Sequence, residues 1–314
     1  MKNDDLIIRE AVINGLKQYY GISSKSIEFR PVGEESHSYV VADEINKKYF
    51  VKYCEREYVI KDIEKVHRFL LLYKDFNFIV PPIEISGITT FPVLKGKLYA
   101  YLFIEGEIIT TSNDKFNKDL INKLTDIMVR INSLKNETIT FLPKEDFNNT
   151  FLSELEKLLE LSQKNKLKIN KETIFFIKEN EESLRETIKE HTKLGEHYKC
   201  KNPLLFLTHG DITGNNIIST SQGLKLVDWD GVMFAPYERD LMFLLDNVNF
   251  SLNKYLKDMG QKEYDPRLIK YYKQQWDLWS VIGNLKNIFT IKLTEEDYQN
   301  YLNEAKQYLE YLIK

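Results

Sequence analysis

One segment near residue 210 concentrates polar side chains of the kinds that activate hydroxyls and hold metal ions. It reads Thr208-His209-Gly210-Asp211-Ile212-Thr213-Gly214-Asn215-Asn216, and an apolar run ending in Asp228-Trp229-Asp230 follows it. Phosphoryl transfer from a nucleotide depends on positioning and charge neutralisation, so it needs a carboxylate beside the attacking hydroxyl and oxygen ligands for magnesium. Asp211 suits the first role, and Asn216 and Asp228 suit the second.

Two strand-like runs, 204–207 and 224–227, flank the loop that carries these residues. A loop that leaves one strand and returns through another would bring all three side chains to one face of a cleft. An isolated Asp in a loop is usually a turn or cap residue. The ordered set, alternating with strands, favours a functional site instead.

The first hundred residues predict a small, mostly β lobe. Helical spacing covers 5–20, and a second helix is expected over 58–73. The expected strands are 26–32, 38–42, 48–54, 83–86 and 98–104, with a hairpin turn over 43–46. The rest of the chain is predominantly helical, ending in three expected helices near 237–249, 265–287 and 294–313. The sequence thus predicts an α+β chain of two lobes, 1–104 and 105–314, with a hinge near 100–106.

Composition narrows the function classes. The chain has 314 residues, a formal net charge of −3 and 29% charged residues, so bulk charge gives no argument for nucleic-acid or membrane binding. Cys54 and Cys200 form no CxxC pair, which fits a reducing compartment. The charged N-terminus is unlike a signal peptide, and no apolar run is long enough to span a bilayer. We expect a cytoplasmic protein, either a monomer or a homodimer.

The ordered motifs resemble the aminoglycoside phosphotransferase and choline kinase family, which has a protein-kinase-like fold. His209-Gly210-Asp211, four residues, Asn216 and then Asp228-Trp229-Asp230 carry the resemblance. The continuation Ala235-Pro236-Tyr237-Glu238-Arg239-Asp240-Leu241 looks most like the spectinomycin phosphotransferase branch, and Tyr19-Tyr20-Gly21 and Tyr49-Phe50-Val51-Lys52 extend the similarity weakly to the N-terminus. The resemblance implies a small-molecule kinase that uses ATP, with GTP left open, and Mg²⁺.

The resemblance also implies roles for the residues around the catalytic loop. Asp211 would be the catalytic base or hydroxyl-orienting residue, and Asn216 and Asp228 would be the magnesium ligands. Asp230 would assist a second metal or face the substrate. The structural roles fall to two further residues: His209 would brace the loop, and Asp240 would accept hydrogen bonds from its backbone.

The N-terminal lobe would supply the nucleotide clamp. By the resemblance, Lys52 contacts the α- and β-phosphates, and its carboxylate partner is expected to be Glu64, with Glu57 as second choice. The phosphate-covering turn would be Gly33-Glu34-Glu35-Ser36-His37-Ser38, in which Ser36, His37 and Ser38 would bind the nucleotide through backbone N–H groups and a serine hydroxyl. The segment 99–104 would be the hinge, with Tyr101 and Phe103 against adenine.

The acceptor is expected to be a hydroxyl-bearing small molecule, cationic or neutral, held by the helical lobe. Trp276, Asp277 and Trp279 are the candidate contacts, since aromatic and acidic groups together suit a cation or a sugar ring. An aminoglycoside or spectinomycin-like aminocyclitol is the first expectation; choline, a methylthioribose-like sugar or homoserine is the alternative. Where the family often has Ile-His-Ser, this chain has Ile131-Asn132-Ser133.

Two other readings compete with a kinase. A non-catalytic member of the fold predicts loss of Lys52, Asp211, Asn216 or Asp228, and all four are present. A metal-dependent phosphoesterase would use His209 and Asp211 as ligands, but the five histidines form no HxH or HxxxH pair. The sequence therefore favours phosphoryl transfer.

Overall fold

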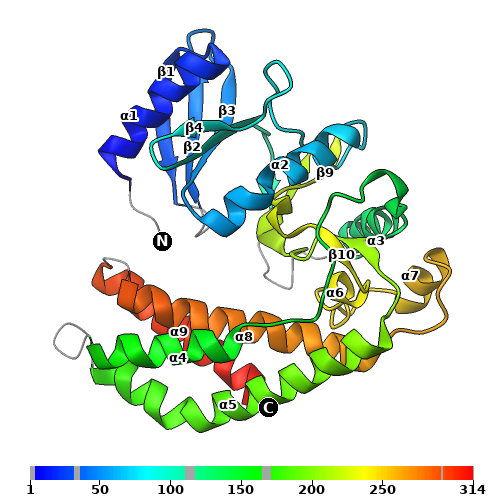
Figure 1. Ribbon diagram of the computed structural model, residues 1–314. Helices are drawn as coiled ribbons and strands as arrows, with labels where there is room; N and C mark the ends of the chain where they lie inside the picture. The colour runs from blue at the N-terminus through cyan, green and yellow to red at the C-terminus, as the bar shows by residue number, and fades with distance from the viewer. Residues whose placement is uncertain (1–3, 32–35, 110–116, 165–170, 291–292, 314) are drawn as a thin grey trace. The chain divides into compact units, whose positions relative to one another are not determined.

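The structure is a computed structural model that describes residues 4–31, 36–109, 117–164, 171–290 and 293–313 (Figure 1). The chain forms two compact units. Unit 1 comprises Met1–Pro143, Phe206–Phe234 and Phe243–Gly260; unit 2 comprises Lys144–Leu205, Ala235–Met242 and Gln261–Lys314. Among the described residues, no helix has both the length and the apolar character that crossing a bilayer demands.

The N-terminal part of unit 1 is an antiparallel sheet of five strands. Their spatial order is β1 (Ser24–Arg30), β2 (Ser36–Asp43), β3 (Lys48–Cys54), β5 (Gly96–Leu102) and β4 (Phe91–Val93). Asp43 closes the β2–β3 hairpin by accepting hydrogen bonds from the backbone N–H groups of Ile45 and Lys47. The predicted strands and turn of this hairpin are confirmed to within two residues.

Alternation along the strands gives this sheet two different faces. Tyr39, Val41 and Val51 are fully buried on one face, where the helix α1 (Leu6–Gly15) packs against them (Figure 1). Ser38 and Tyr99 lie directly opposite Lys52 on the neighbouring strands, so all three point to the other face. The register therefore gathers the chain's candidate nucleotide contacts on the face away from α1.

The remainder of unit 1 builds the catalytic-loop region. Its elements are the helices α2 (Glu57–Leu72), α3 (Lys118–Asn132) and α7 (Leu252–Asp258), a sheet of β6 (Glu107–Ile108), β8 (Ile217–Thr220) and β9 (Gly223–Leu226), and the pair β7 (Phe206–Thr208) and β10 (Met233–Ala235). The loop between β7 and β8 carries Asp211, and the chain after β9 carries Asp228. Strands thus flank both segments, as the sequence predicts.

Unit 2 is helical. Its long helices are α4 (Phe151–Lys164), α5 (Lys171–Lys201), α8 (Pro266–Thr290) and α9 (Glu295–Ile313), which run alongside one another in Figure 1, and it also holds the short α6 (Glu238–Leu241). Leu155, Leu285 and Leu302 are fully buried at the centre of their shared core. The predicted α+β class, with a β-rich N-terminal part and a helical C-terminal part, is confirmed.

The predicted helix over 237–249 is wrong in length. The structure has only the one-turn α6 there, followed by turns, and it adds α7, which the sequence did not predict. Near the end of the predicted range, the side-chain Oδ1 of Asn247 accepts the backbone N–H of Asn249, an interaction that competes with helical hydrogen bonding there.

Candidate functional site

His209 is the centre of the catalytic loop's hydrogen bonds. Its Nδ1 accepts the backbone N–H of Asp211 at 3.2 Å, so Nε2 carries the proton and donates to the carbonyl of Val227 at 3.1 Å. The ring is fully buried and meets the Trp229 indole edge-on, with 4.5 Å between ring centroids. One neutral imidazole therefore ties the loop to the segment that precedes Asp228.

Asn216 provides the second tie between the same two segments. Its side-chain Nδ2 donates to the Asp211 carbonyl at 3.1 Å, and its own carbonyl accepts the backbone N–H of Val227 at 2.9 Å. The first bond orients the amide so that Oδ1 remains as an acceptor for a ligand. The structure thus brings Asp211 and Asn216 together with Val227, the residue next to Asp228.

Asp228 turns the chain sharply after β9. Its backbone is left-handed, with φ 61° and ψ 62°, which is uncommon for a residue other than glycine and costs of order 1 kcal/mol. The carboxylate pairs with Lys52 at 2.8 Å, and Asp230 lies 3.9 Å from the same Nζ. The turn therefore directs two carboxylates of one short segment toward the lysine of β3.

Electrostatics at this cluster favour the charged forms of both partners. Burial alone would lower the pKa of Lys52, but the charges of Asp228 and Asp230 outweigh it and raise that pKa well above its ordinary value. Burial would raise the pKa of Asp228, but the Lys52 charge and hydrogen bond outweigh it and lower that pKa. Lys52 is accordingly a fixed cation, and Asp228 is a fixed anion, at neutral pH.

The sheet face that carries Lys52 also carries most of the predicted nucleotide contacts. Ser36 and Ser38 alternate onto this face from β2, and Tyr101 reaches it from β5, two residues after Tyr99. The Ser38 hydroxyl is buried and has no hydrogen-bond partner among the described residues, so it can donate to a ligand. Phe103 follows β5, and its backbone N–H is taken by the Lys48 carbonyl at 3.1 Å.

His37 lies elsewhere. Strand alternation turns it to the opposite face of β2, where its ring is near Phe29 and Tyr53, with centroids 6.3 Å and 6.2 Å away. The His37 ring is therefore turned away from the face that carries Lys52, and the expected contact of this turn with the phosphates through its backbone N–H groups stays a prediction. Gly33, Glu34 and Glu35 of the same predicted turn lie outside the described residues.

Glu64 is not the partner of Lys52. Its carboxylate accepts the Thr90 hydroxyl at 2.8 Å and lies 3.5 Å from the Lys97 ammonium group. The reason is the rotation of α2 about its own axis. The residue that this rotation turns toward Tyr99 and Tyr101 is His67, one turn after Glu64, and not a carboxylate. Sequence reasoning missed His67, although a histidine on the apolar side of α2, beside Val66 and Leu70, was a signal.

The remaining predicted residues belong to unit 2. Asp240 is fully buried in α6, and its predicted contact with the catalytic loop stays a prediction. Trp279 of α8 is 59% exposed and meets Phe151 edge-on. Burial raises the pKa of Asp277 to about 6, against a lowering by the Lys273 charge.

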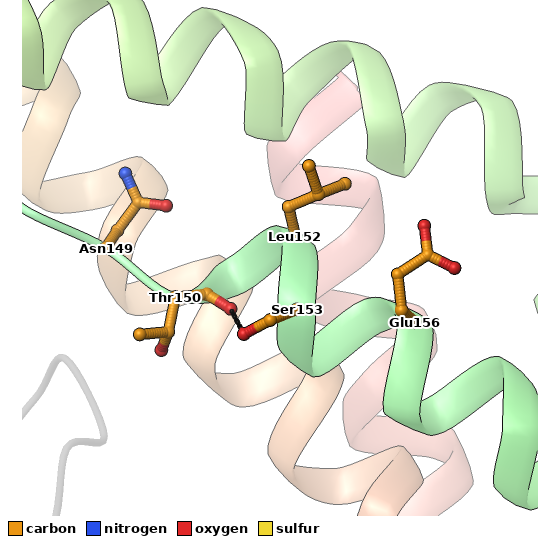
Figure 2. A pocket seen from close by; sticks show the side chains of 5 residues that line it. All are labelled: Asn149, Thr150, Leu152, Ser153 and Glu156. Atoms are coloured by element: carbon orange, nitrogen blue, oxygen red, sulfur yellow. Dashed lines mark hydrogen bonds between the residues drawn. The ribbon is translucent and has the colours of Figure 1, made fainter.

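Unit 2 also contains an open cavity of about 460 Å³ at the start of α4. Asn149, Thr150, Leu152, Ser153 and Glu156 line it, and Figure 2 shows their side chains on the segment that leads into α4 and on the first turns of the helix. The Ser153 hydroxyl is bonded to the Thr150 carbonyl and the Glu156 carboxylate to Arg185, so both groups have protein partners. None of the predicted acceptor residues lines this cavity.

The donor set at Asn216 and Asp228 fits magnesium. Mg²⁺ prefers oxygen ligands, commonly one or two carboxylates plus phosphate oxygens and water. Asn216 offers an amide oxygen, and Asp228 offers a carboxylate held in its ionised form. No cluster of three or more His, Cys, Asp or Glu suited to a metal occurs in the described part of the chain, so phosphate and water would complete the coordination.

Comparisons with known proteins identify the family and the fold. A family model described as the phosphotransferase enzyme family matches residues 26–283. A comparison with curated proteins found no match. Among solved structures, spectinomycin phosphotransferase APH(9)-Ia in complex with ADP and spectinomycin is similar at 20% identity and TM-score 0.70, covering 95% of this chain and 93% of that one.

Two further structures are similar over almost their whole length. The APH(2")-IIIa complex with GDP and kanamycin is 13% identical with TM-score 0.62, covering 97% of this chain and 99% of that one. The ethanolamine kinase of Plasmodium vivax is 14% identical with TM-score 0.58, covering 98% and 95%. At these identities the likeness establishes the fold, which is the kinase-like fold that the sequence predicts.

Proposed function

Because the chain belongs to the phosphotransferase enzyme family, as its motifs predict, we propose that it transfers the γ-phosphoryl group of ATP to a hydroxyl of a small molecule. Asp211 lies against the attacking hydroxyl and orients it or accepts its proton. Lys52 contacts the α- and β-phosphates, and the hydroxyls of Ser36 and Ser38 face the phosphates. Tyr101 and Phe103 border the base.

Asn216 and Asp228 would hold Mg²⁺, which supplies charge neutralisation on the phosphate oxygens. When Asp228 engages the metal, Lys52 keeps Asp230 as a nearby carboxylate. The amide of Asn216 is already oriented by its bond to Asp211, so little reorganisation is needed at that ligand. GTP in place of ATP is an outcome that nucleotide competition would reveal.

The observation that carries the proposal is the closed set of hydrogen bonds around the loop. His209 links the Asp211 backbone to Val227, and Asn216 links the same two residues by separate bonds. These bonds join the backbone of Asp211 to Asn216 and to Val227, the residue before Asp228, and so support the proposal that a catalytic carboxylate and two metal ligands act together here. Catalysis of phosphoryl transfer requires that kind of positioning. A residue that only formed a turn or a helix cap would not require it.

The acceptor that we propose is an aminoglycoside or a spectinomycin-like aminocyclitol. Asp277 supports it, because a carboxylate whose pKa is raised by partial burial would gain from an ammonium group. Trp276 and Trp279 on the same helix offer aromatic surface for a cation or a sugar ring. The solved relatives with bound spectinomycin and kanamycin support the same class.

We place the reaction in the cytoplasm. Cys54 is buried and Cys200 is exposed, and both are free thiols, which suits a reducing compartment. ATP is supplied there as well.

A nucleotide-consumption screen tests the proposal. Purified protein with Mg²⁺ and ATP is offered spectinomycin, aminoglycosides, choline, ethanolamine, homoserine and sugar alcohols, with Asp211→Asn as control. Acceptor-dependent ADP release by the wild type alone supports a kinase, and the active acceptor identifies the class. Activity with an amine metabolite as the sole acceptor would refute an antibiotic acceptor but would still support a small-molecule kinase. Wild-type protein that binds no nucleotide would refute the proposal altogether.

A further inference from the structure

The histidine of α2 occupies a buried position between the helix and the Lys52 face of the sheet. His67 is fully buried. Its Nδ1 lies 2.8 Å from the Thr89 hydroxyl and its Nε2 lies 2.9 Å from the Tyr101 hydroxyl. Both hydroxyls can donate or accept, so either neutral tautomer satisfies both bonds. The mechanism described above gives this residue no role.

Tyr101 joins the histidine to the nucleotide face. It lies in β5 two residues after Tyr99, which is opposite Lys52, and it is itself opposite Phe50 of β3. The His67 ring contacts the Tyr99 ring edge-on at 5.2 Å and the Tyr101 ring edge-on at 5.8 Å. Tyr101 is half-buried, so its ring lies partly under α2 and is partly accessible.

A phenol in this position would otherwise be free to change rotamer. One hydrogen bond from a fully buried, immobile partner removes that freedom before a ligand arrives, and preorganisation of this kind lowers the cost of binding. In the structure Lys52 is paired with carboxylates from residues 228–230, so α2 has no ion pair with it. A polar contact that α2 does make with the nucleotide face is the neutral bond from His67 to Tyr101.

We propose that His67 is a positioning residue for the nucleotide. By bonding the Tyr101 hydroxyl it holds that ring on the face that carries Lys52, so that a purine nucleotide meets a preformed aromatic wall. This inference rests on the proposed function, since it names how the same nucleotide site is shaped. Burial and the Lys52 charge both lower the pKa of His67, to about 3, which keeps the imidazole neutral throughout the working range.

Two substitutions of His67 separate this role from simple packing. In His67→Gln, the side-chain amide reaches the position of Nε2 and can keep the bond to Tyr101. In His67→Asn, the shorter side-chain amide reaches only the position of Nδ1, so it can keep the bond to Thr89 but not the bond to Tyr101. Calorimetric titration with Mg²⁺ and ADP should give an affinity for His67→Gln within about twofold of the wild type. We expect His67→Asn to lose about fivefold to tenfold, the size of one hydrogen bond.

Tyr101→Phe tests the other partner of the same hydrogen bond. It removes the hydroxyl and keeps the ring, so it should weaken ADP as much as His67→Asn does, and the double variant should be no weaker than either single variant. The exposed His197, substituted by Asn, is the matched control and should bind ADP like the wild type. Melting temperatures of all variants establish that they are folded.

The outcomes are distinct. Equal ADP affinities for His67→Asn and His67→Gln, or additive losses in the double variant, would overturn the positioning role and leave the kinase proposal intact. Wild-type protein that binds no ADP would overturn both.

Discussion

Lys52 is bound to carboxylates that come from one short segment of the chain, residues 228–230. The Asp228 pair is the closer of the two, at 2.8 Å against 3.9 Å for Asp230, and the Lys52 side chain is only 13% exposed. A charge this well shielded is expensive to leave without a partner. The arrangement therefore keeps the lysine charged and oriented before nucleotide binds, and nucleotide phosphates can take the place of a carboxylate.

Removing the Lys52 charge should weaken nucleotides according to their phosphate content. Lys52→Met is expected to lower ATP affinity by about tenfold or more, because one charged hydrogen bond contributes roughly 1.5 to 3 kcal/mol, while adenosine affinity changes little. Competition binding with ATP, ADP and adenosine measures this. Lys25→Met, at an exposed site in β1, is the control. Equal weakening of ATP and adenosine would remove Lys52 from the phosphates.

Asp211 should matter for turnover and not for nucleotide binding. Asp211→Asn keeps the size of the side chain and the loop's backbone bonds to His209 and Asn216. We expect kcat to fall by roughly 10²- to 10⁴-fold, the usual range for a lost general base. ADP affinity should stay within about twofold by calorimetry. Near-normal turnover would contradict the assigned role.

At the scale of elements, the sequence predicts the strands, turns and loops that depend on a local pattern of residues. The β2–β3 hairpin follows from alternation and from Asp43 in the turn, and the loop with Asp211 and Asn216 follows from its flanking strands. Which face of a sheet a side chain occupies is harder to predict, because an offset of one residue moves it to the other face. His37 illustrates this, since its ring lies on the face of β2 opposite to Ser36 and Ser38. The rotation of α2 about its axis, which turns His67 instead of Glu64 toward Tyr99 and Tyr101, likewise depends on tertiary packing.

Asn132 shows how two helices support strand β7, which leads into the loop with His209 and Asp211. Its side-chain Nδ2 donates to the Leu207 carbonyl of β7 at 2.7 Å, and its Oδ1 accepts the Tyr255 hydroxyl of α7 at 2.7 Å. Sequence comparison marked Asn132 only as a departure from a family histidine. The structure gives the reason for a polar residue there: α3 and α7 both hold β7, two residues before His209.

Tyr255→Phe should therefore reduce stability. The substitution deletes one buried hydrogen bond and keeps the ring, at a position with 0% exposure. We expect a loss of roughly 1 to 2 kcal/mol in the free energy of unfolding. Tyr311→Phe, at a tyrosine that is 53% exposed in α9, should cost less than about 0.5 kcal/mol. Urea unfolding of both variants checks this, and equal losses would show that the Asn132 bond contributes nothing special.

At the scale of the whole molecule, each unit buries a histidine whose pKa is lowered by its burial. His67 in unit 1 and His191 in unit 2 are both fully buried. Both ring nitrogens of His191 lack hydrogen-bond partners among the described residues, and the ring stacks on Tyr271 with centroids 4.3 Å apart. Burial lowers the pKa of His191 to about 4, and that of His67 to about 3 with help from Lys52.

The sign of the resulting pH dependence follows from linkage. A histidine in the unfolded chain titrates near pH 6.5, so between about pH 6.5 and 4 the unfolded state binds a proton that folded His191 does not. Stability from this group is complete above pH 6.5 and falls as pH decreases through that window. Asp277 acts in the opposite sense, because its raised pKa of about 6 lets the folded state bind the extra proton first. The pH profile of the wild type alone would therefore mix the two effects.

His191→Phe isolates the histidine, since Asp277 is the same in both proteins. Phe keeps an aromatic ring between Tyr271 and Phe151 and removes the titrating group, with no buried polar atom left behind. Relative to the wild type, the variant should gain about 3 kcal/mol in the free energy of unfolding between pH 7 and pH 4. Urea unfolding at a series of pH values measures the difference. A difference that stays constant across the window would mean that His191 titrates normally in the folded protein, and hence that water reaches its ring.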